Sequence, residues 1–186
     1  MPVASVWRLK KTVVLVGMMG AGKTAIGRSL AVLLNVPFRD SDAEIEAAAA
    51  MSIAEIFARD GEAFFRDRET QVIDRLLDDT PAILSAGGGA FLADRNRELI
   101  RDKGVAVWLK ADLALLWSRV KHKDTRPLLR TAHPYETLAA LYNTRVPVYE
   151  MADLAVEANA AYSIETMAEK VRDALASRED VMERVS

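Results

Sequence analysis

Residues 12–24 read TVVLV followed by GMMGAGKT, a short apolar run that leads directly into a glycine-rich loop. The run at 12–16 is rich in β-branched residues, which is typical of a strand buried on both faces. Residues 17–24 match the pattern G-x-x-x-x-G-K-[ST], and apolar residues at helical spacing come directly after them. A glycine-rich turn could match this pattern by chance, but the flanking strand and helix are the context that the motif requires. The stretch therefore predicts a nucleotide-phosphate site.

The chemistry of this loop is predicted from its glycines, its lysine and its threonine. Glycines let successive backbone N–H groups point at phosphate oxygens, and the N-terminus of the following helix adds partial positive charge. Lys23 would reach the β- and γ-phosphates of ATP as a point charge, and the Thr24 hydroxyl would bind Mg²⁺. The predicted nucleotide contacts in the loop are Gly20, Ala21, Gly22, Lys23, Thr24 and Ala25.

Beyond the loop, apolar runs alternate with helical patterns along the whole chain. Predicted strands are residues 12–16, 36–38, 82–84, 105–109 and 154–156, and predicted helices include 53–57, 64–77, 94–101, 113–120 and 135–149, with a break near Gly61 and a last helix that carries Ile164, Met167, Ala168, Val171 and Leu175 on one face. Strands and helices that alternate with short connections predict an α/β fold, a parallel sheet covered by helices on both faces. Residues 178–186 are charged, and we expect them to fray.

Composition limits the classes of function. The 186 residues fit a single globular domain, predicted to span 1–186. The formal net charge of −2 gives no electrostatic reason to expect nucleic acid or an anionic membrane as a partner. The absence of cysteine excludes disulfides and thiolate metal sites. No apolar run approaches the roughly 20 residues that cross a bilayer, and the N-terminus lacks a secretory signal, so we expect a soluble cytoplasmic protein.

The residues after the third predicted strand indicate the kind of nucleotide protein. That strand ends in Ser85 and glycines, where many ATPases place the acidic residue of a Walker B motif. Nothing in the sequence resembles N-K-x-D, the usual guanine-reading motif of GTPases. These features argue against a motor or a GTPase switch and favour a compact kinase whose second substrate occupies the cleft.

Two carboxylates, Asp40 and Asp42, follow the second predicted strand. If the chain stays extended there, residues two apart point to the same side, at the strand end where open α/β sheets bind ligands. One carboxylate could then organise Mg²⁺ through water while the other accepts hydrogen bonds from substrate hydroxyls. The alternative is structural, because Asp42 before AEIEAA could simply cap a helix. The sequence leaves both interpretations open.

Three consecutive glycines, Gly87, Gly88 and Gly89, come directly after the third predicted strand. Consecutive glycines cost conformational entropy, so they usually mark a close approach of the backbone to another group or a positive φ angle. A tight turn from strand to helix is the structural alternative, although such a turn rarely needs all three.

Arginines complete the candidate site. A guanidinium matches carboxylate and phosphate bidentately, so a site for two anionic ligands would use several of them, here Arg66, Arg126 and Arg145. Arg66 could instead pair with Glu69 along its own helix. Arg126 lies in residues 121–134, an aperiodic stretch long enough to be a mobile lid. A lid arginine that closes over the γ-phosphate would supply charge in the transition state and exclude water.

The sequence resembles the shikimate kinase family over about residues 13–171. The motifs that carry the resemblance occur in the family's order: GMMGAGKTAIGR, the D-S-D pair, FRDRE, SAGGGA, RPLL and RVPVY. The resemblance implies that ATP phosphorylates the 3-hydroxyl of shikimate, a step toward chorismate and the aromatic amino acids. It also implies a P-loop kinase fold with a five-stranded parallel sheet of order 2-3-1-4-5, and the predicted molecule is a monomer.

Roles for individual residues follow from the same resemblance. Lys23 and Thr24 hold the phosphates and Mg²⁺, and Asp40 supports the metal. Asp42 binds ring hydroxyls and orients the attacking one. On the substrate side, Arg66 and Arg145 grip the shikimate carboxylate, and Gly87, Gly88 and Gly89 lie against the ring. On the nucleotide side, Arg126 covers the transferred phosphate and Arg119 lies beside the adenine. One segment departs from the family pattern, because VEANAAYS near Val156 replaces a more polar loop on the adenine side.

Two rival functions remain open. A kinase of another small hydroxy acid, such as gluconate, would share the phosphate loop but would not need the D-S-D pair and the triple glycine together. A non-catalytic nucleotide-binding module would bind ATP without turning over any hydroxylated acid, yet Lys23, Thr24, Asp42 and Arg126 are all present.

Overall fold

The structure is a computed structural model and describes residues 6–121 and 129–185. Its elements are, in chain order, β1 (Trp7–Leu9), β2 (Thr12–Val16), α1 (Lys23–Leu34), β3 (Phe38–Asp40), α2 (Ser41–Ala49), α3 (Ile53–Asp78), β4 (Ile83–Ser85), η1 (Ala90–Leu92), α4 (Asp94–Lys103), β5 (Gly104–Lys110), α5 (Leu113–Val120), α6 (Pro134–Tyr149), β6 (Leu154–Glu157), α7 (Ile164–Ala176) and β7 (Met182–Arg184).

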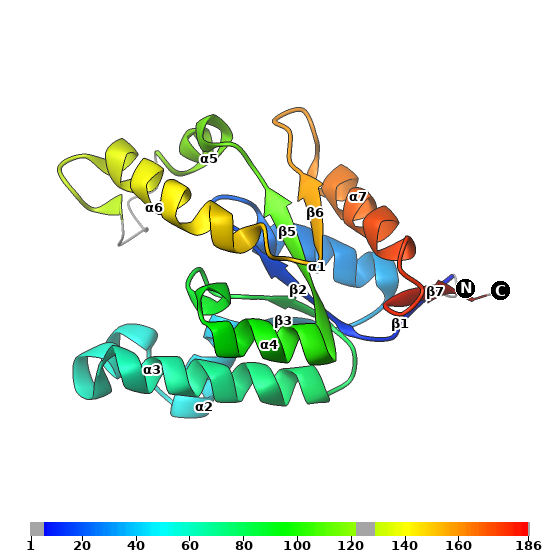
Figure 1. The fold of residues 1–186 in the computed structure, drawn as a ribbon, viewed down its shortest axis with the longest axis horizontal. Helices are drawn as coiled ribbons and strands as arrows, with labels where there is room; N and C mark the ends of the chain where they lie inside the picture. Colours follow the sequence, from blue (N-terminus) through cyan, green and yellow to red (C-terminus); the bar gives the residue numbers. More distant parts are fainter. Residues whose placement is uncertain (1–5, 122–128, 186) are drawn as a thin grey trace.

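A five-stranded parallel sheet with the order β3-β4-β2-β5-β6 forms the centre of the molecule (Figure 1). Counting the predicted strands along the chain, this is the order 2-3-1-4-5, so the expected topology is confirmed. Strand β2 lies in the middle, paired with β4 on one side and β5 on the other. The phosphate loop therefore leaves from the central strand, at the edge where parallel strands end together.

Helices cover both faces of the sheet, as the alternating pattern predicts. Helices α1 and α7 pack against each other on one face, and α4 lies against β5 on the other (Figure 1). Strand β2 is buried throughout, in agreement with its β-branched composition. The apolar stripe on α7 is buried except for Ile164, which is 47% exposed because it is the first residue of the helix.

The second strand begins two residues later than predicted. Strand β3 starts at Phe38, opposite Ile83 of β4, and not at Val36. The intervening Pro37 has no N–H to donate to a ladder, although its carbonyl accepts a hydrogen bond from Ile83 N–H at 2.9 Å. The shift places Asp40 at the end of the strand, directly before α2.

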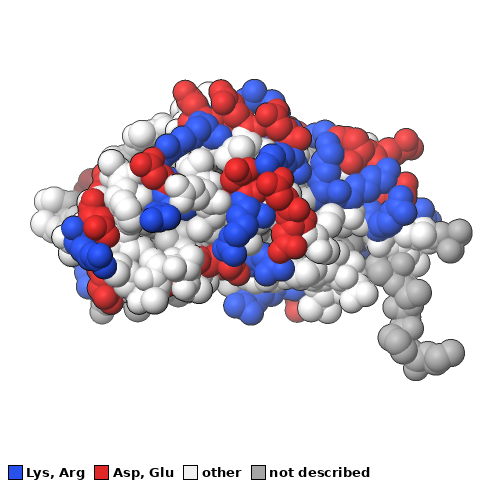
Figure 2. Space-filling model, turned by 90° about the horizontal axis from the view of Figure 1, so that it is seen from below, with Lys and Arg blue, Asp and Glu red and all other residues white. Residues whose placement is uncertain are grey.

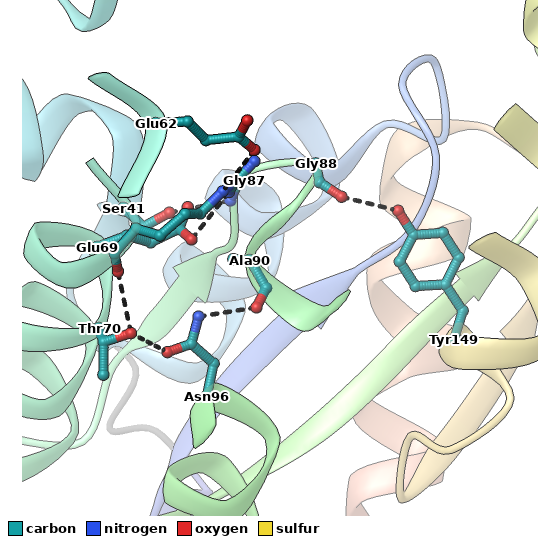
Figure 3. Close-up of polar contacts among 10 residues, drawn as sticks. Ser41, Glu62, Glu69, Thr70, Gly87, Gly88, Ala90, Asn96 and Tyr149 are labelled. Carbon is teal, nitrogen blue, oxygen red and sulfur yellow. Dashed lines mark hydrogen bonds and ion pairs between the residues drawn. The ribbon is translucent and has the colours of Figure 1, made fainter. Parts of the chain in front are cut away.

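The predicted break near Gly61 is present within α3. Gly61 has φ 84° and ψ 172°, far from helical values, so two helical segments meet at a kink there. The second segment carries Arg66, Glu69 and Thr70, and Figure 3 shows Thr70 beside Asn96 of α4.

The expectation that residues 178–186 fray is wrong for the part that the structure describes. Residues 182–184 form β7, which pairs antiparallel with β1. Val181 and Met182 are buried, so two apolar side chains anchor an otherwise charged tail. Lys11 lies 3.3 Å from Asp180, and the hydrogen bond from Arg178, with help from Lys11, lowers the pKa of Asp180 to about 2.

Charged side chains are interspersed on the face formed by α2, α3 and α4 (Figure 2). Helices α3 and α4 are joined there by ion pairs between Arg95 and Asp67 at 2.8 Å and between Lys103 and Asp74 at 2.6 Å. Both signs alternate, which agrees with a net charge near zero. Within the described residues, no helix is long and apolar enough to cross a membrane.

Candidate active site at the carboxyl edge of the sheet

The phosphate loop joins β2 to α1 with the backbone conformation that its glycines allow. Gly20 and Gly22 have φ angles of 84° and 93°, a region that side chains disfavour. A Cβ added to Gly20 would also lie 2.8 Å from Cγ1 of Val120, so space is limiting as well. Thr24 and Ala25 lie in the first turn of α1 and are exposed, at the helix end where partial positive charge favours an anion.

Lys23 folds back over the same loop. Its Nζ donates to the carbonyl oxygen of Gly17 at 2.6 Å and lies 3.4 Å from that of Met18. The ammonium group is therefore held above the loop by these carbonyl oxygens. When a nucleotide binds, phosphate oxygens would replace the carbonyls as acceptors of its hydrogen bonds.

Arg119, which the resemblance places beside the adenine, lies against the phosphate loop. Its Nη1 donates to the carbonyl oxygen of Gly20 at 3.0 Å, from the last turn of α5. This contact brings a second cation to the nucleotide side of the site, while its relation to the base stays a prediction.

The expectation that the chain stays extended through Asp40 and Asp42 is wrong, so strand geometry does not place the two side chains. Helix α2 begins at Ser41, and Asp40 is its N-cap. The Asp40 Oδ1 accepts hydrogen bonds from the N–H groups of Asp42 at 2.9 Å and Ala43 at 3.2 Å. A helix cap is therefore present, but the capping residue is Asp40 and not Asp42. Asp42 lies in the first turn of α2, and its carboxylate is not used as the cap.

The freed carboxylate of Asp42 points at the glycine loop. A Cβ added to Gly87 would lie 2.5 Å from Asp42 Oδ1. Burial, and then the neighbouring charge of Asp40, raise the pKa of Asp42, whereas Lys23 and Arg66 lower it. A partly buried carboxylate with cations from two different elements around it is the kind of group that active sites use.

Gly87, Gly88 and Gly89 are explained by close approach and not by a positive φ. None of the three has a positive φ in the structure. A Cβ added to Gly89 would lie 2.6 Å from Arg66 Nη2, and one added to Gly88 would lie 3.2 Å from Arg145 Nη1. Each glycine therefore makes room for one candidate site residue.

Arg66 pairs with Glu69, as the structural alternative predicts, and also lies against the glycine loop. Its Nη1 donates to Glu69 Oε1 at 3.0 Å along its own helix, and Glu69 is only 1% exposed. Burial raises the pKa of Glu69, and the charge of Arg66 opposes that rise. The pair holds the guanidinium against the glycine loop, with Glu62 at 3.7 Å from its Nε.

Three further side chains hold the glycine loop, and none of them was predicted from the sequence (Figure 3). Ser41 Oγ accepts a hydrogen bond from Gly87 N–H at 2.9 Å, and Asn96 Nδ2 donates to the carbonyl of Ala90 at 2.8 Å. Tyr149 donates its hydroxyl to the carbonyl of Gly88 at 3.1 Å. Ser41 lies between the two aspartates of the D-S-D pair, which was an available signal.

The lid and its arginine cannot be placed in this site. Arg126 lies outside the described residues, as do the other positions from 122 to 128 of the predicted lid at 121–134. Its catalytic role remains a prediction from the sequence.

The sheet order, the phosphate loop with its lysine, and the carboxylate and arginines around the facing glycine loop together define a P-loop kinase that acts on a small molecule. The family model described as shikimate kinase matches residues 19–176. The chain therefore belongs to the shikimate kinase family.

Individual relatives agree with this assignment. The chain is 67% identical to a shikimate kinase of Ruegeria pomeroyi over 94% of this chain and 90% of that one. It is 65% identical to a shikimate kinase of Cereibacter sphaeroides, covering 95% of this chain and 88% of that protein. A solved structure of a shikimate kinase from Acinetobacter baumannii in complex with shikimate matches with a TM-score of 0.82 at 38% identity, over 90% of this chain and 93% of that one.

Proposed function

We propose that this chain is a shikimate kinase, which transfers the γ-phosphoryl group of ATP to the 3-hydroxyl of shikimate and yields shikimate 3-phosphate and ADP. The observation that carries the proposal is the position of Asp42, within the electrostatic reach of Lys23 on the nucleotide side and of Arg66 on the substrate side. The two substrates would meet at this carboxylate.

Shikimate binding is assigned to the glycine loop and the two arginines beside it. Arg66 from α3 and Arg145 from α6 both lie against residues 87–89. Two guanidinium groups converging on one loop match a carboxylate better than a neutral ligand, because each can donate two parallel hydrogen bonds. The backbone of this loop would then lie against the ring.

Asp42 is assigned the role of orienting the attacking hydroxyl and accepting its proton. A carboxylate whose pKa is raised is a stronger base than an ordinary one, which favours proton transfer from an alcohol. Phosphoryl transfer depends mainly on positioning and on charge stabilisation, so the orienting role is the larger of the two.

Lys23 and Arg126 are assigned to the phosphates. Lys23 would leave the carbonyl of Gly17 to follow the γ-phosphoryl oxygens as their charge redistributes. Arg126 would act from the lid, where a second cation would stabilise the same oxygens once water is excluded. These roles rest on the sequence motif for Arg126 and on the geometry of the loop for Lys23.

Thr24 and Asp40 fit a magnesium ion bound together with ATP. The Thr24 side chain is exposed at the start of α1, and Asp40 uses only Oδ1 for its cap, so Oδ2 can accept from a metal-bound water. In the described part of the chain no group of three or more acidic or histidine side chains is placed to hold a metal ion, so Mg²⁺ would be held mainly by phosphates and water. When bound, Mg²⁺ would neutralise charge on the β- and γ-phosphates.

The working form of the enzyme is proposed to be a single-domain monomer in the cytoplasm, with no nucleic acid or membrane as partner. One hydrophobic cluster joins the sheet and its helices, which supports a single domain. The absence of cysteine is compatible with a reducing compartment.

A coupled assay for ADP, with ATP and Mg²⁺ in the presence of shikimate, gluconate or no acceptor, tests the proposed function. We expect turnover with shikimate alone. Turnover with gluconate would favour the other hydroxy-acid kinase, and ATP binding without turnover on either acid would favour a non-catalytic module.

A further inference from the structure

Tyr149, at the end of α6, is a buried titratable group to which the proposed mechanism gives no task. It is 1% exposed, although it carries a hydroxyl that must find a partner when it is removed from water. Its ring packs beside Trp108, with ring centroids 6.3 Å apart, so the ring belongs to the core while the hydroxyl reaches out of it.

The hydroxyl contacts both of the groups that face the substrate from this side. It donates to the carbonyl oxygen of Gly88 at 3.1 Å, across 61 residues of sequence (Figure 3). Arg145 lies one helical turn before Tyr149, the spacing at which side chains on a helix meet. Burial raises the pKa of Tyr149, and the charge of Arg145 and its hydrogen bond to the tyrosine oppose that rise.

Arg145, Tyr149 and Gly88 have the donors and acceptors of a hydrogen-bond chain with one direction, and its second bond, from Tyr149 to Gly88, is formed. The guanidinium can only donate, the carbonyl can only accept, and the phenol does both. Because the Tyr149 proton goes to Gly88, the Tyr149 oxygen can act only as an acceptor toward Arg145, one helical turn away. Each bond in such a chain polarises the next, which defines the positions of its two ends together. Arg145 Nη1 also lies 3.2 Å from the position that a Cβ on Gly88 would occupy, so the guanidinium lies close to the backbone of Gly88.

We propose that Tyr149 is a positioning residue, which holds the guanidinium of Arg145 and the backbone of Gly88 in the relative placement that a carboxylate-bearing substrate requires. This inference rests on the proposed function, because it assigns Tyr149 to the same substrate side. It adds a residue that acts through Arg145 and Gly88 and that does not itself touch the reacting atoms.

The test is Tyr149→Phe, which removes the hydroxyl and keeps the ring beside Trp108. Loss of one net hydrogen bond should raise the KM for shikimate about 3- to 10-fold. We expect kcat and the KM for ATP to stay within about twofold, because those steps do not use this contact. Tyr142→Phe on the same helix is the matched control, and it should leave all three constants unchanged.

A double-mutant cycle with Arg145→Lys separates positioning from a general loss of stability. If Tyr149 acts through Arg145, the two variants share one effect, so the combined rise in KM should be clearly smaller than the product of the single rises. A multiplicative rise, an unchanged KM in Tyr149→Phe, or an equal change in kcat and in both KM values with a lower Tm would each overturn the inference. The wild-type enzyme is assayed first, and failure of that enzyme to phosphorylate shikimate would reject the proposed function instead.

Discussion

Two glycine loops face each other across the active site, and they use glycine for different reasons. In the phosphate loop, Gly20 and Gly22 adopt positive φ angles that side chains disfavour. In the loop at residues 87–89, the backbone is ordinary, and the glycines are needed because Asp42, Arg66 and Arg145 press against it. The first loop is defined by its own conformation and the second by its neighbours.

The difference is also one of sequence distance. Lys23 bonds to a carbonyl only 6 residues before it, whereas Tyr149 bonds to one that is 61 residues away. The loop at 87–89 has neighbours from α2, α3 and α6, so it forms only when these helices pack. Nucleotide binding should therefore depend on a local motif, and substrate binding should depend on the assembled tertiary structure.

Removing the Lys23 side chain should give the largest loss of activity, and this loss should come from the nucleotide side of the site. Lys23→Ala deletes the charge that follows the γ-phosphoryl group, so we expect kcat to fall by about a thousandfold or more. The fold should be intact, because the side chain is not part of the hydrophobic core. The coupled assay measures kcat, and circular dichroism checks the fold. Near-normal activity would contradict the kinase assignment.

The lid arginine should come next, with an effect on rate rather than on affinity. If Arg126 contacts the phosphate mainly as it is transferred, Arg126→Ala should lower kcat by about a hundred- to a thousandfold. The Kd for shikimate should change little, which calorimetry can measure. Hydrogen exchange across residues 121–134, with and without both ligands, tests the lid itself. Unchanged exchange together with unchanged kcat would leave Arg126 without a catalytic role.

Replacing a glycine by alanine tests whether that glycine is required by its packing neighbours or by its own positive φ angle. Gly87→Ala places a Cβ 2.5 Å from Asp42 Oδ1, so the carboxylate must move. A displacement of that order can lower kcat about a hundredfold.

Gly61→Ala is the matched control for that variant. Gly61 has φ +84°, and nothing lies within 4 Å of an added Cβ. The substitution should cost about 1–3 kcal/mol of stability, because φ 84° with ψ 172° is a backbone conformation that essentially only glycine adopts. Its kcat at 25 °C should match the wild type. If both variants lost only stability, the glycines at 87–89 would serve the backbone and not the site.

Changing the arginines beside the second loop should weaken only the substrate side. Arg66→Lys and Arg145→Lys keep the charge but lose the bidentate fork, so shikimate binding should weaken by about 1.5–3 kcal/mol. ATP binding, measured by calorimetry on the same samples, should change little. Arg68→Lys on α3, an exposed arginine over Phe64, is the control. Equal losses for both ligands would assign these arginines to the phosphates or to the fold.

The smallest expected effect concerns stability and the buried carboxylate. Because burial and Asp40 raise the pKa of Asp42, protonated Asp42 stabilises the fold at low pH, and this contribution is lost as pH rises through the raised pKa. At pH 7 the ionised carboxylate therefore costs stability. Asp42→Asn should raise stability there by about 0.5–2 kcal/mol while activity falls.

Thermal unfolding between pH 4 and pH 7 measures this effect. The gain in Tm over the wild type should shrink as the pH falls toward the ordinary carboxyl value near 3.8. Glu98→Gln, at an exposed position on α4, should show no such trend. A gain that is constant with pH would mean that the charge of Asp42 is not its source.

The helix boundaries show where prediction from the sequence stops. The start of α5 at Leu113 and the kink at Gly61 were predictable, because periodicity and glycine act within a few residues. The D-S-D pair was ambiguous, because both an extended chain and a capped helix satisfy the same letters. Only the pairing of β3, which starts after Pro37 and ends at Asp40, decided that Asp40 caps α2 and that the Asp42 carboxylate is not used as the cap.

The sequence by itself determined the parallel sheet and the phosphate loop, and its resemblance to the family implied the strand order. Alternating periodicity dictates parallel strands, and the loop is built from its own backbone. The tertiary structure alone decided that β7 closes against β1 and that Ser41, Asn96 and Tyr149 hold the glycine loop. Such contacts join residues far apart in the chain, and a single serine, asparagine or tyrosine carries no periodic signal. Their partners are defined only when the helices pack and buried polar groups must be satisfied.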